Sequence, residues 1–437
     1  MHRGHESAAV TVALDAAALQ RAELALLKSA LSGAPLSLPA PAAGLDWDAL
    51  YAEMQAQAVA ALPADALPYA DMPAGAAEQW RQCGMRHVKR CLEVLAAQEA
   101  LVGLLEGAGL RVAVLKGTAA ARRYPCPQYR SLGDVDFIAS FADAPAGTGE
   151  DRAASDAAAF DEACRIMQAA GYVLGDECGS HVHMHGDGVL FEPHRWFVSR
   201  PGADGAWHGV DAAIRKGMDA LRHVELFGFR MPVLPDAADG LVLAAHMRGH
   251  LEQGFGLRHL VDWAAFVADC CDDAFWETEF RPIVAECGLE TLAVTAARTA
   301  QLYLGLPEQG RTWCAGADEE LCDCLMEDVL ASGNFGRKLG GMLTADAQAG
   351  YWDVRHPLRL LGRAQRVGSG KLARAGYGAP VRAFGWAYQL GFLAKQYAAL
   401  SGGGRVRFLK RTGAASPARA RDEMLADLGI RRRSEKG

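Results

Sequence analysis

The stretch RSLGDVDFIAS, residues 130–140, decides the fold class of this chain. Its segment DVDFIA (134–139) follows a glycine, is rich in apolar residues and alternates in the manner of a β-strand. Residues two apart on a strand point to the same face, so the carboxylates of Asp134 and Asp136 should stand side by side. Adjacent carboxylates repel each other unless a cation lies between them, and Mg²⁺ or Mn²⁺ suits oxygen ligands. The pair is therefore either a metal site or the polar edge of a strand.

A second short strand, RVAVL (111–115), lies upstream and runs into the turn LKGTA. Gly117 lets the backbone approach a ligand closely. Lys116, Thr118 and the amide groups of the following helix are placed to hold phosphate oxygens. The strand and turn together are typical of a nucleotide-binding loop.

The order of elements between residues 85 and 235 predicts an α/β or α+β domain. A long helix over about 78–109 precedes the two strands, and a helix over 156–172 follows them. Three further strands are predicted at 172–177, 181–187 and 188–194, the last of which supplies a third carboxylate, Glu192. We expect a small mixed sheet flanked by helical regions at both ends of the chain. The predicted division is an N-terminal helical region (1–84), the α/β core (85–235), a C-terminal helical domain (236–400) and a basic tail (401–437).

Several motifs together carry a family resemblance. They are LKG (115–117), R-x-x-G-D-x-D (130–136), the Gly-Tyr that ends a helix (171–172), the acidic-x-His motif EPH (192–194), and the helical segments LAAHMRGH and LRHLVDW. In this combination the chain resembles the bacterial "uncharacterised nucleotidyltransferase" family, in the superfamily that includes DNA polymerase β. The resemblance spans about residues 85–270.

This resemblance implies a nucleotidyltransferase core that moves a nucleoside monophosphate from an NTP donor to an acceptor. It implies Mg²⁺ or Mn²⁺ as cofactor, held by Asp134 and Asp136, with Glu192 completing the acceptor-side ion or acting as base. Lys116 and Arg130 would neutralise charge on the leaving pyrophosphate. The other candidate site residues are Gly117, Thr118 and Gly133 for the nucleotide, and His194, His246 and Asp262 for the cleft.

The third acidic motif departs from the family pattern. Pro193 follows Glu192, and Arg195 separates His194 from the next tryptophan. Proline lacks a donor for strand pairing, so we expect an edge or an end of a strand there. Asp187 is the substitute for Glu192 if the alignment shifts.

Two histidine groups allow more than one interpretation. His181, His183 and His185 alternate on one predicted strand and are either metal ligands or side chains of an exposed edge strand beside the cleft. His246 and His250 are one helical turn apart, but the position of a metalloprotease glutamate is occupied by methionine. His246 and Asp262 either join helices by hydrogen bonds or line the cleft.

Composition limits the class of protein. The net charge is −7, yet residues 351–437 contain 18 Lys and Arg against 5 Asp and Glu. This basic end predicts an anionic partner or docking onto the acidic remainder, with a solvated terminus as the alternative. No stretch reaches a membrane span or a signal-peptide core, and the eleven cysteines lack zinc-site spacing. We expect a cytoplasmic protein with reduced thiols.

Three hypotheses about the activity of the chain and its acceptor are open. The first is an active enzyme that modifies a small molecule, peptide or protein, and the resemblance hints at a biosynthetic cluster. The second is a catalytically impaired nucleotide-binding or scaffold protein, suggested by the altered EPHRW segment. The third is a toxin-like nucleotidyltransferase that acts on tRNA, for which the basic tail is the only support.

Overall fold

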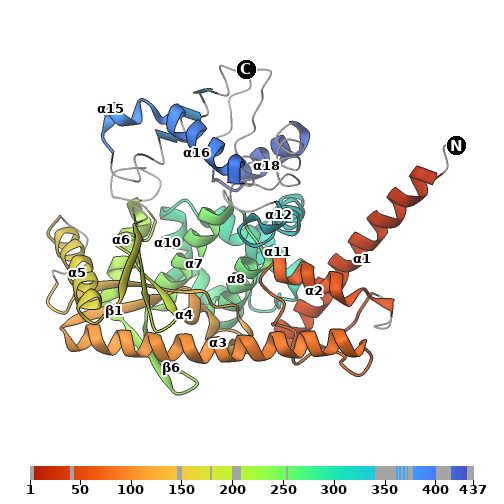
Figure 1. The fold of residues 1–437 in the computed structure, drawn as a ribbon, viewed down its shortest axis with the longest axis horizontal. Helices are drawn as coiled ribbons and strands as arrows, with labels where there is room; N and C mark the ends of the chain where they lie inside the picture. The colour runs from red at the N-terminus through yellow and green to blue at the C-terminus, as the bar shows by residue number, and fades with distance from the viewer. Residues whose placement is uncertain are drawn as a thin grey trace.

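A computed structural model describes most of the chain up to residue 339 and parts of the C-terminal region. The described residues are 4–39, 44–144, 150–177, 180–198, 208–251, 254–339, 361–362, 364–365, 368–369, 372, 377–399 and 415–430. Figure 1 shows the sheet on one side of the molecule, helices beside it, and the long helix α3 beneath both.

Seven strands form one mixed sheet in the order β3-β4-β5-β2-β1-β7-β6, which confirms the predicted fold class. The central strand β2 pairs antiparallel with β1 and parallel with β5. The strands are β1 (Leu110–Leu115), β2 (Asp134–Phe141), β3 (Val173–Glu177), β4 (Val182–Gly186), β5 (Val189–Pro193), β6 (Arg222–Leu226) and β7 (Phe229–Val233).

Helices cover both faces of the sheet and form the rest of the described chain. The longer ones are α1 (Gly4–Ser32), α2 (Trp47–Ala56), α3 (Ala74–Gly107), α5 (Glu150–Ala169), α6 (His208–Gly217), α7 (Asp236–Leu251), α8 (Leu257–Cys270), α11 (Glu290–Leu304), α12 (Glu319–Ser332), α16 (Gly385–Ala399) and α18 (Ala415–Asp427). Short helical turns include α4 (Gly117–Ala121), η2 (Pro127–Tyr129), η4 (Met218–Ala220), α9 (Asp273–Phe275), η5 (Trp276–Phe280), α10 (Arg281–Glu286), η6 (Thr312–Gly316), η7 (Asn334–Leu339) and α15 (Ala379–Arg382).

The five predicted strands are all present, with small shifts at their ends, but the hairpin of β6 and β7 was not predicted. Its two-residue turn is Phe227-Gly228, and both residues have positive φ, 53° and 84°. Such a turn usually contains Asn, Asp or Gly at both positions. Because phenylalanine occupies the first position, the sequence carries only half of the usual hairpin signal.

The long helix α3 joins two hydrophobic cores. Its C-terminal half packs with α5 on one face of the sheet, around Val94, Leu101 and Phe137. Its N-terminal half belongs to a core shared by the N-terminal helices, the other sheet face and the C-terminal helices, where Trp80 contacts Trp47 edge-on. The predicted boundary at residue 84 falls inside α3, and the division into four parts stays a prediction.

Part of the predicted basic tail is a helix packed on the body. On α18, Met424 and Leu425 are buried, and Arg421 forms an ion pair with Asp328 of α12 at 2.6 Å. Residues 401–414 and 431–437 lie outside the described part of the chain, so the anionic partner stays a prediction. Among the described residues no helix is both long and apolar enough to cross a membrane, and the ten described cysteines are free.

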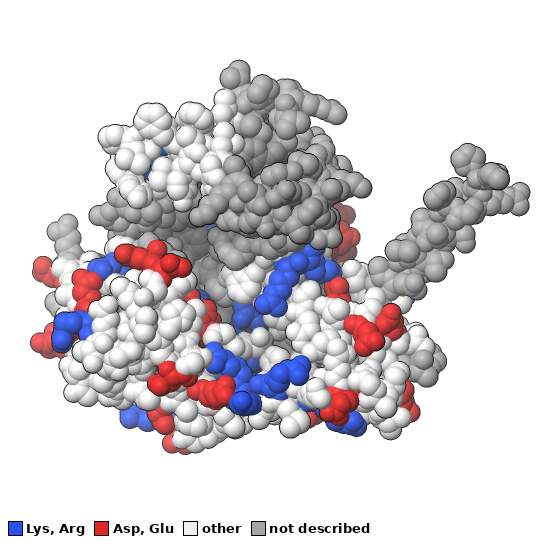
Figure 2. Space-filling view, in the orientation of Figure 1, with Lys and Arg blue, Asp and Glu red and all other residues white. Residues whose placement is uncertain are grey.

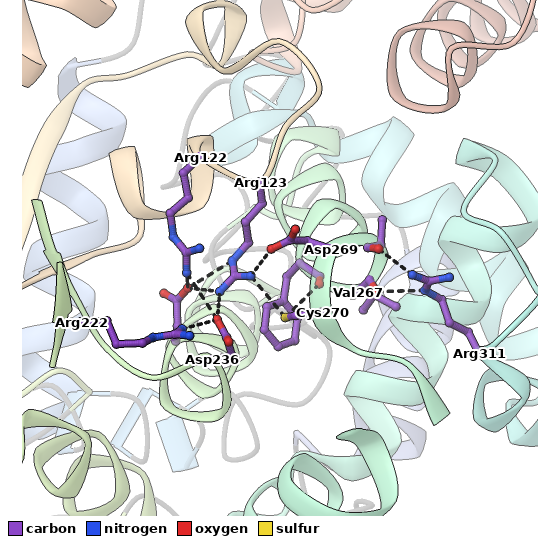
Figure 3. A network of polar contacts seen from close by, with 11 residues as sticks. Arg122, Arg123, Arg222, Asp236, Val267, Asp269, Cys270 and Arg311 are labelled. Carbon is purple, nitrogen blue, oxygen red and sulfur yellow. Dashed lines mark hydrogen bonds and ion pairs between the residues drawn. The ribbon is translucent and has the colours of Figure 1, made fainter. Parts of the chain in front are cut away.

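A buried arginine ties the turn after β1 to the helical region (Figure 3). The Arg123 guanidinium lies 2.7 Å from Asp236 Oδ1, 2.8 Å from Asp239 Oδ2 and 2.6 Å from Asp269 Oδ2. Arg122 adds a contact of 3.1 Å to Asp239. These carboxylates lie on α7 and α8, so the network fixes α4 and the preceding loop against both helices.

We expect Arg123→Leu to lower the free energy of unfolding by about 3 kcal/mol, because the buried Asp239 loses the closer of its two arginine partners and keeps only Arg122. Urea unfolding monitored by circular dichroism measures this change. Arg281→Leu is the matched control, since Arg281 pairs with Glu277 and Glu290 on the exposed surface. An Arg123 variant as stable as this control would contradict the structural role of the network.

A buried carboxyl in α1 predicts a pH-dependent stability. Glu23 is fully buried, neither of its oxygens has a hydrogen-bond partner among the described residues, and burial and the nearby Glu53 raise its pKa to about 8. The folded state therefore binds this proton more tightly than the unfolded state, and stability falls as the pH rises from about 4.5 to about 8. At one unit of pKa per 1.36 kcal/mol, the full loss is about 3 to 5 kcal/mol.

Glu23→Gln cannot ionise, so we expect its stability to lack this decline. Urea unfolding of both proteins at intervals between pH 5 and pH 8.5 tests the prediction. Parallel curves for the two proteins would show that Glu23 is not held protonated.

Candidate active site

Three carboxylates meet at one edge of the sheet. Asp134 and Asp136 are the first and third residues of β2, and the parallel pairing of β2 with β5 places Asp136 directly beside Glu192. One oxygen from each of the three carboxylates lies within 4.8 Å of the other two. The three acids that the sequence assigned to one site are therefore brought together.

The unusual residue after Glu192 does not disturb this arrangement. Pro193 is the last residue of β5, as expected for a proline that lacks a pairing donor. The N–H of His194 then continues the pairing by donating to the carbonyl of Phe137 at 2.8 Å. The substitute Asp187 lies in the turn between β4 and β5, at the opposite end of β5 from Glu192.

The Asp136 carboxylate is almost fully buried and has two cationic or donor partners. Lys116 Nζ and His194 Nε2 each lie 2.8 Å from Asp136 Oδ1. Although burial would raise the pKa of Asp136, Lys116 and His194 together hold this pKa well below its usual range. Burial would lower the pKa of Lys116, but Asp136 and Asp134 raise it instead. Both groups are therefore charged near neutral pH.

The pKa of Glu192 is shifted in the opposite direction from that of Asp136. Burial, followed by repulsion from Asp136 and Asp134, raises the pKa of Glu192 to about 8. Its carboxylate lies 3.5 Å from His181 Nε2 and 3.3 Å from His183 Nε2. Burial and the neighbouring His194 lower the pKa of His181 to about 4, so this imidazole is neutral.

The interpretation of His181, His183 and His185 as an exposed edge strand was wrong. Their strand β4 lies between β3 and β5, because β3 adds a further antiparallel strand outside it. His181 and His183 instead point to Glu192, and His185 is exposed. Sequence reasoning placed these histidines on one strand but missed their contact with the third carboxylate.

The loop between β1 and α4 brings Lys116 against the acids. Lys116 has φ 51° and ψ −132°, a conformation that costs energy for a residue with a side chain, and Gly117 follows with φ 32°. A Cβ atom on Gly117 would lie 3.5 Å from the Asp134 carbonyl. Thr118 is buried and donates to Gln98 of α3 at 2.5 Å. The loop is thus pressed between β2 and α3.

Arg130 and Asp262, predicted separately, form one buried pair. Arg130 Nε and Nη2 each lie 2.8 Å from an oxygen of Asp262, and the Tyr124 hydroxyl donates to the same carboxylate at 2.5 Å. This pair connects the start of the RSLGD segment to α8. The carbonyl of Gly133 accepts from Arg90 of α3 at 2.9 Å. The nucleotide-binding roles of Arg130 and Gly133 stay predictions.

His246 lies in a second cluster next to this site. Its Nε2 is 2.8 Å from His250 Nε2, and one nitrogen of each of His246, His250 and His259 lies within 4.8 Å of the others. Burial has the largest effect in lowering the pKa of both histidines. It is followed by Lys116 for His246, and by Arg258 and then Lys116 for His250. Sequence reasoning missed Arg258, which contacts His259, because nothing in LRHLVDW shows which side chains pair.

Comparison with known proteins identifies a family for this chain. The family model for an uncharacterised nucleotidyltransferase matches residues 43–147 and 154–305, which is more than half of the chain. The chain belongs to this family. No curated protein and no solved structure matches it significantly. The family match begins at residue 43 and therefore includes α2 and α3, well before the start at residue 85 that the motifs suggested.

In this member of the nucleotidyltransferase family, variants of Arg130 and Asp262 can distinguish a structural role of Arg130 from a role in ligand binding. Arg130→Leu leaves Asp262 as a buried charge without its guanidinium, so we expect the free energy of unfolding to fall by about 3 to 5 kcal/mol. Arg130→Leu with Asp262→Leu removes both charges and should restore most of that stability. Urea unfolding measures both effects.

A double variant that folds normally then tests the predicted role of Arg130 in binding the donor. Lost NTP affinity would show that the Arg130–Asp262 pair takes part in nucleotide binding, and retained affinity would show that the Arg130 guanidinium does not contact the nucleotide. Isothermal titration calorimetry measures this affinity.

Proposed function

We propose that this chain is a divalent-metal-dependent nucleotidyltransferase that moves a nucleoside monophosphate from an NTP to an acceptor hydroxyl or similar group. The observation that carries the proposal is the meeting of Asp134, Asp136 and Glu192 within 4.8 Å at one sheet edge. The family to which the chain belongs supports nucleotidyl transfer as the class of reaction.

The donor set fits Mg²⁺ or Mn²⁺. The three groups are all carboxylates, the hard oxygen ligands that these ions prefer, and the placement of Lys116 Nζ at 2.8 Å from Asp136 supports a preference for positive charge there. Asp134, Asp136 and Glu192 would hold the metal. When bound, it would neutralise phosphate charge and act as a Lewis acid on the donor.

The reaction forms a bond between the acceptor oxygen and the α-phosphorus and breaks the bond from that phosphorus to the bridging oxygen of the β-phosphate. Pyrophosphate leaves with that oxygen, and the acceptor proton must go to a base. Glu192 is the candidate base in place of its role as a metal ligand: it lies beside Asp136, and burial and repulsion from Asp136 and Asp134 raise its pKa to about 8, so its carboxylate accepts a proton readily when it does not hold the metal. His181 and His183 hold its carboxylate in place.

Among acceptors we favour a small molecule, peptide or protein. A catalytically impaired scaffold is less well supported, since Glu192 lies beside the aspartates despite the altered EPHRW segment. No contact among the described residues favours tRNA. The biosynthetic context and the cytoplasmic location stay predictions.

The proposal predicts label transfer from an α-labelled NTP to a component of a cell extract in the presence of Mg²⁺. We expect Asp134→Asn with Asp136→Asn to reduce transfer by at least about a thousandfold, because both metal ligands on β2 are lost. Asp176→Asn, on the exposed strand β3 of the same sheet, is the matched control and should transfer normally.

Thermal unfolding gives a second readout that does not need the acceptor. Mg²⁺ or Mn²⁺ should raise the melting temperature of the wild type and of the Asp176 variant, whereas EDTA reverses the rise. The Asp134 and Asp136 variant should show no such rise. The proposal would be wrong if the aspartate substitutions changed neither metal binding nor NTP binding.

A further inference from the structure

Arg258 and three histidines gather around one aromatic ring beside the carboxylates. The Arg258 guanidinium carbon lies 5.3 Å from the centre of the Phe335 ring, and the rings of His250 and His259 lie 4.9 Å and 5.9 Å from it. His246 contacts both of these histidines. The cluster therefore combines side chains from α7, α8 and η7, segments up to about ninety residues apart.

Close backbone packing holds the cluster together. A Cβ atom on Gly254 would lie 2.2 Å from the amide nitrogen of Gly336, and one on Gly256 would lie 2.5 Å from that of Asn334. The turn between α7 and α8 thus touches η7 directly. Phe335 has φ 54°, a strained conformation that directs its ring to the histidines.

Arg258 differs from the other cations near the acids. Lys116 pairs with Asp136 and Arg130 pairs with Asp262, both at 2.8 Å. In the described part of the chain Arg258 has no carboxylate within 4.0 Å, its buried Nε has no hydrogen-bond partner, and its one polar contact is from Nη2 to His259 Nε2 at 3.4 Å. Arg258 as a whole residue is nevertheless only partly buried.

The surroundings of Arg258 leave its charge poorly compensated. Burial, and then repulsion from Arg130, lower the pKa of Arg258, while Asp262 and Asp134 act on it only from a distance. An arginine side chain carries five N–H donors, and a cation in a partly desolvated place is unfavourable until an anion pairs with it. On the face drawn in Figure 2, Lys and Arg side chains gather in the middle, with acidic groups on both sides.

We propose that Arg258 forms an anion-binding site that takes the terminal phosphates of the donor nucleotide. The identification of the ligand as a donor nucleotide rests on the proposed function. The preference of the site for a phosphate anion follows from the unpaired charge of the Arg258 guanidinium alone. Arg258 binds phosphate oxygens directly. His259 and Phe335 act as positioning residues that orient the guanidinium.

The three histidines by themselves resemble a zinc site, since one nitrogen of each lies within 4.8 Å of the others. Two contacts disfavour a metal. The Gly256 N–H faces His259 Nδ1 at 3.3 Å, and Arg258 Nη2 faces His259 Nε2 at 3.4 Å. A neutral imidazole can accept at only one of its two nitrogens, so at most one of these contacts is a hydrogen bond to the ring, and the adjacent guanidinium would repel a cation.

Calorimetric titration of the full chain with inorganic pyrophosphate in saturating Mg²⁺ tests the site. We expect Arg258→Gln to weaken pyrophosphate binding by about tenfold or more, because a charge-assisted hydrogen-bonding partner is lost. Arg258→Lys should recover part of the affinity. Arg281→Gln removes an exposed, ion-paired arginine and should bind as the wild type does. Thermal unfolding verifies that each variant is folded.

Nucleotides then separate this site from the rest of the donor pocket. Arg258→Gln should weaken NTP binding by the same factor and leave nucleoside monophosphate binding unchanged, since a monophosphate does not reach the terminal-phosphate site. Equal loss for NTP and monophosphate, or unchanged pyrophosphate affinity, would overturn the proposal.

The remaining outcomes distinguish a failure of the anion-site proposal from a failure of the proposed function. Pyrophosphate binding that depends on Arg258 supports the site even if the wild type binds no NTP, a result that would count against the proposed function alone. Titration with Co²⁺ tests the metal alternative. A visible absorption band of tetrahedral cobalt that His250→Ala abolishes, and that pyrophosphate does not displace, would overturn the anion site.

Discussion

The parallel pairing of β2 with β5 is the constraint on which the site depends, because it sets Asp136 directly opposite Glu192. The arrangement is unfavourable by itself, since three carboxylates converge within 4.8 Å and repel one another. Lys116 and His194 offset this repulsion at Asp136, and the raised pKa of Glu192 offsets it at the third acid, where burial and the two aspartates favour the protonated form. Contacts elsewhere in the fold therefore stabilise the close arrangement of the three carboxylates, as expected where carboxylates bind a cation.

These stabilising contacts lie far from the acids. The strained Lys116 conformation persists because α4 behind it is fixed by Arg123 to three carboxylates on α7 and α8. Asp262 on α8 holds Arg130 at the other end of the same loop region. The Arg123 and Arg130 contacts thus connect the sheet to helices α7 and α8, which also lie within the matched family segment.

Local patterns predicted the parts of the site that lie close together in the sequence. The two aspartates on β2 and the Lys116 turn follow from short-range alternation and from glycine, and both are present. Partners separated by long stretches of chain carry no such signal. Arg130 was assigned to the donor, but its guanidinium meets Asp262, 132 residues later, and the contact of His183 with Glu192 depends on the pairing of β4 with β5. The β6–β7 hairpin was missed for a local reason, the phenylalanine in its turn.

The charges at the site favour a ligand that carries both positive and negative charge. Asp134 and Glu192 lack a lysine or arginine within 4.0 Å among the described residues, whereas Arg258 lacks an anion. A divalent ion alone would compensate the charge of the carboxylates but would repel the Arg258 guanidinium. A phosphate alone would compensate the charge of Arg258 but would repel the carboxylates. In the proposed function, Asp134, Asp136 and Glu192 would hold the metal, and Arg258 would bind the negative oxygens of the polyphosphate. Because this combination would relieve both imbalances at once, the proposed binding of a metal–nucleotide complex fits the electrostatics of the folded chain better than the binding of either component alone.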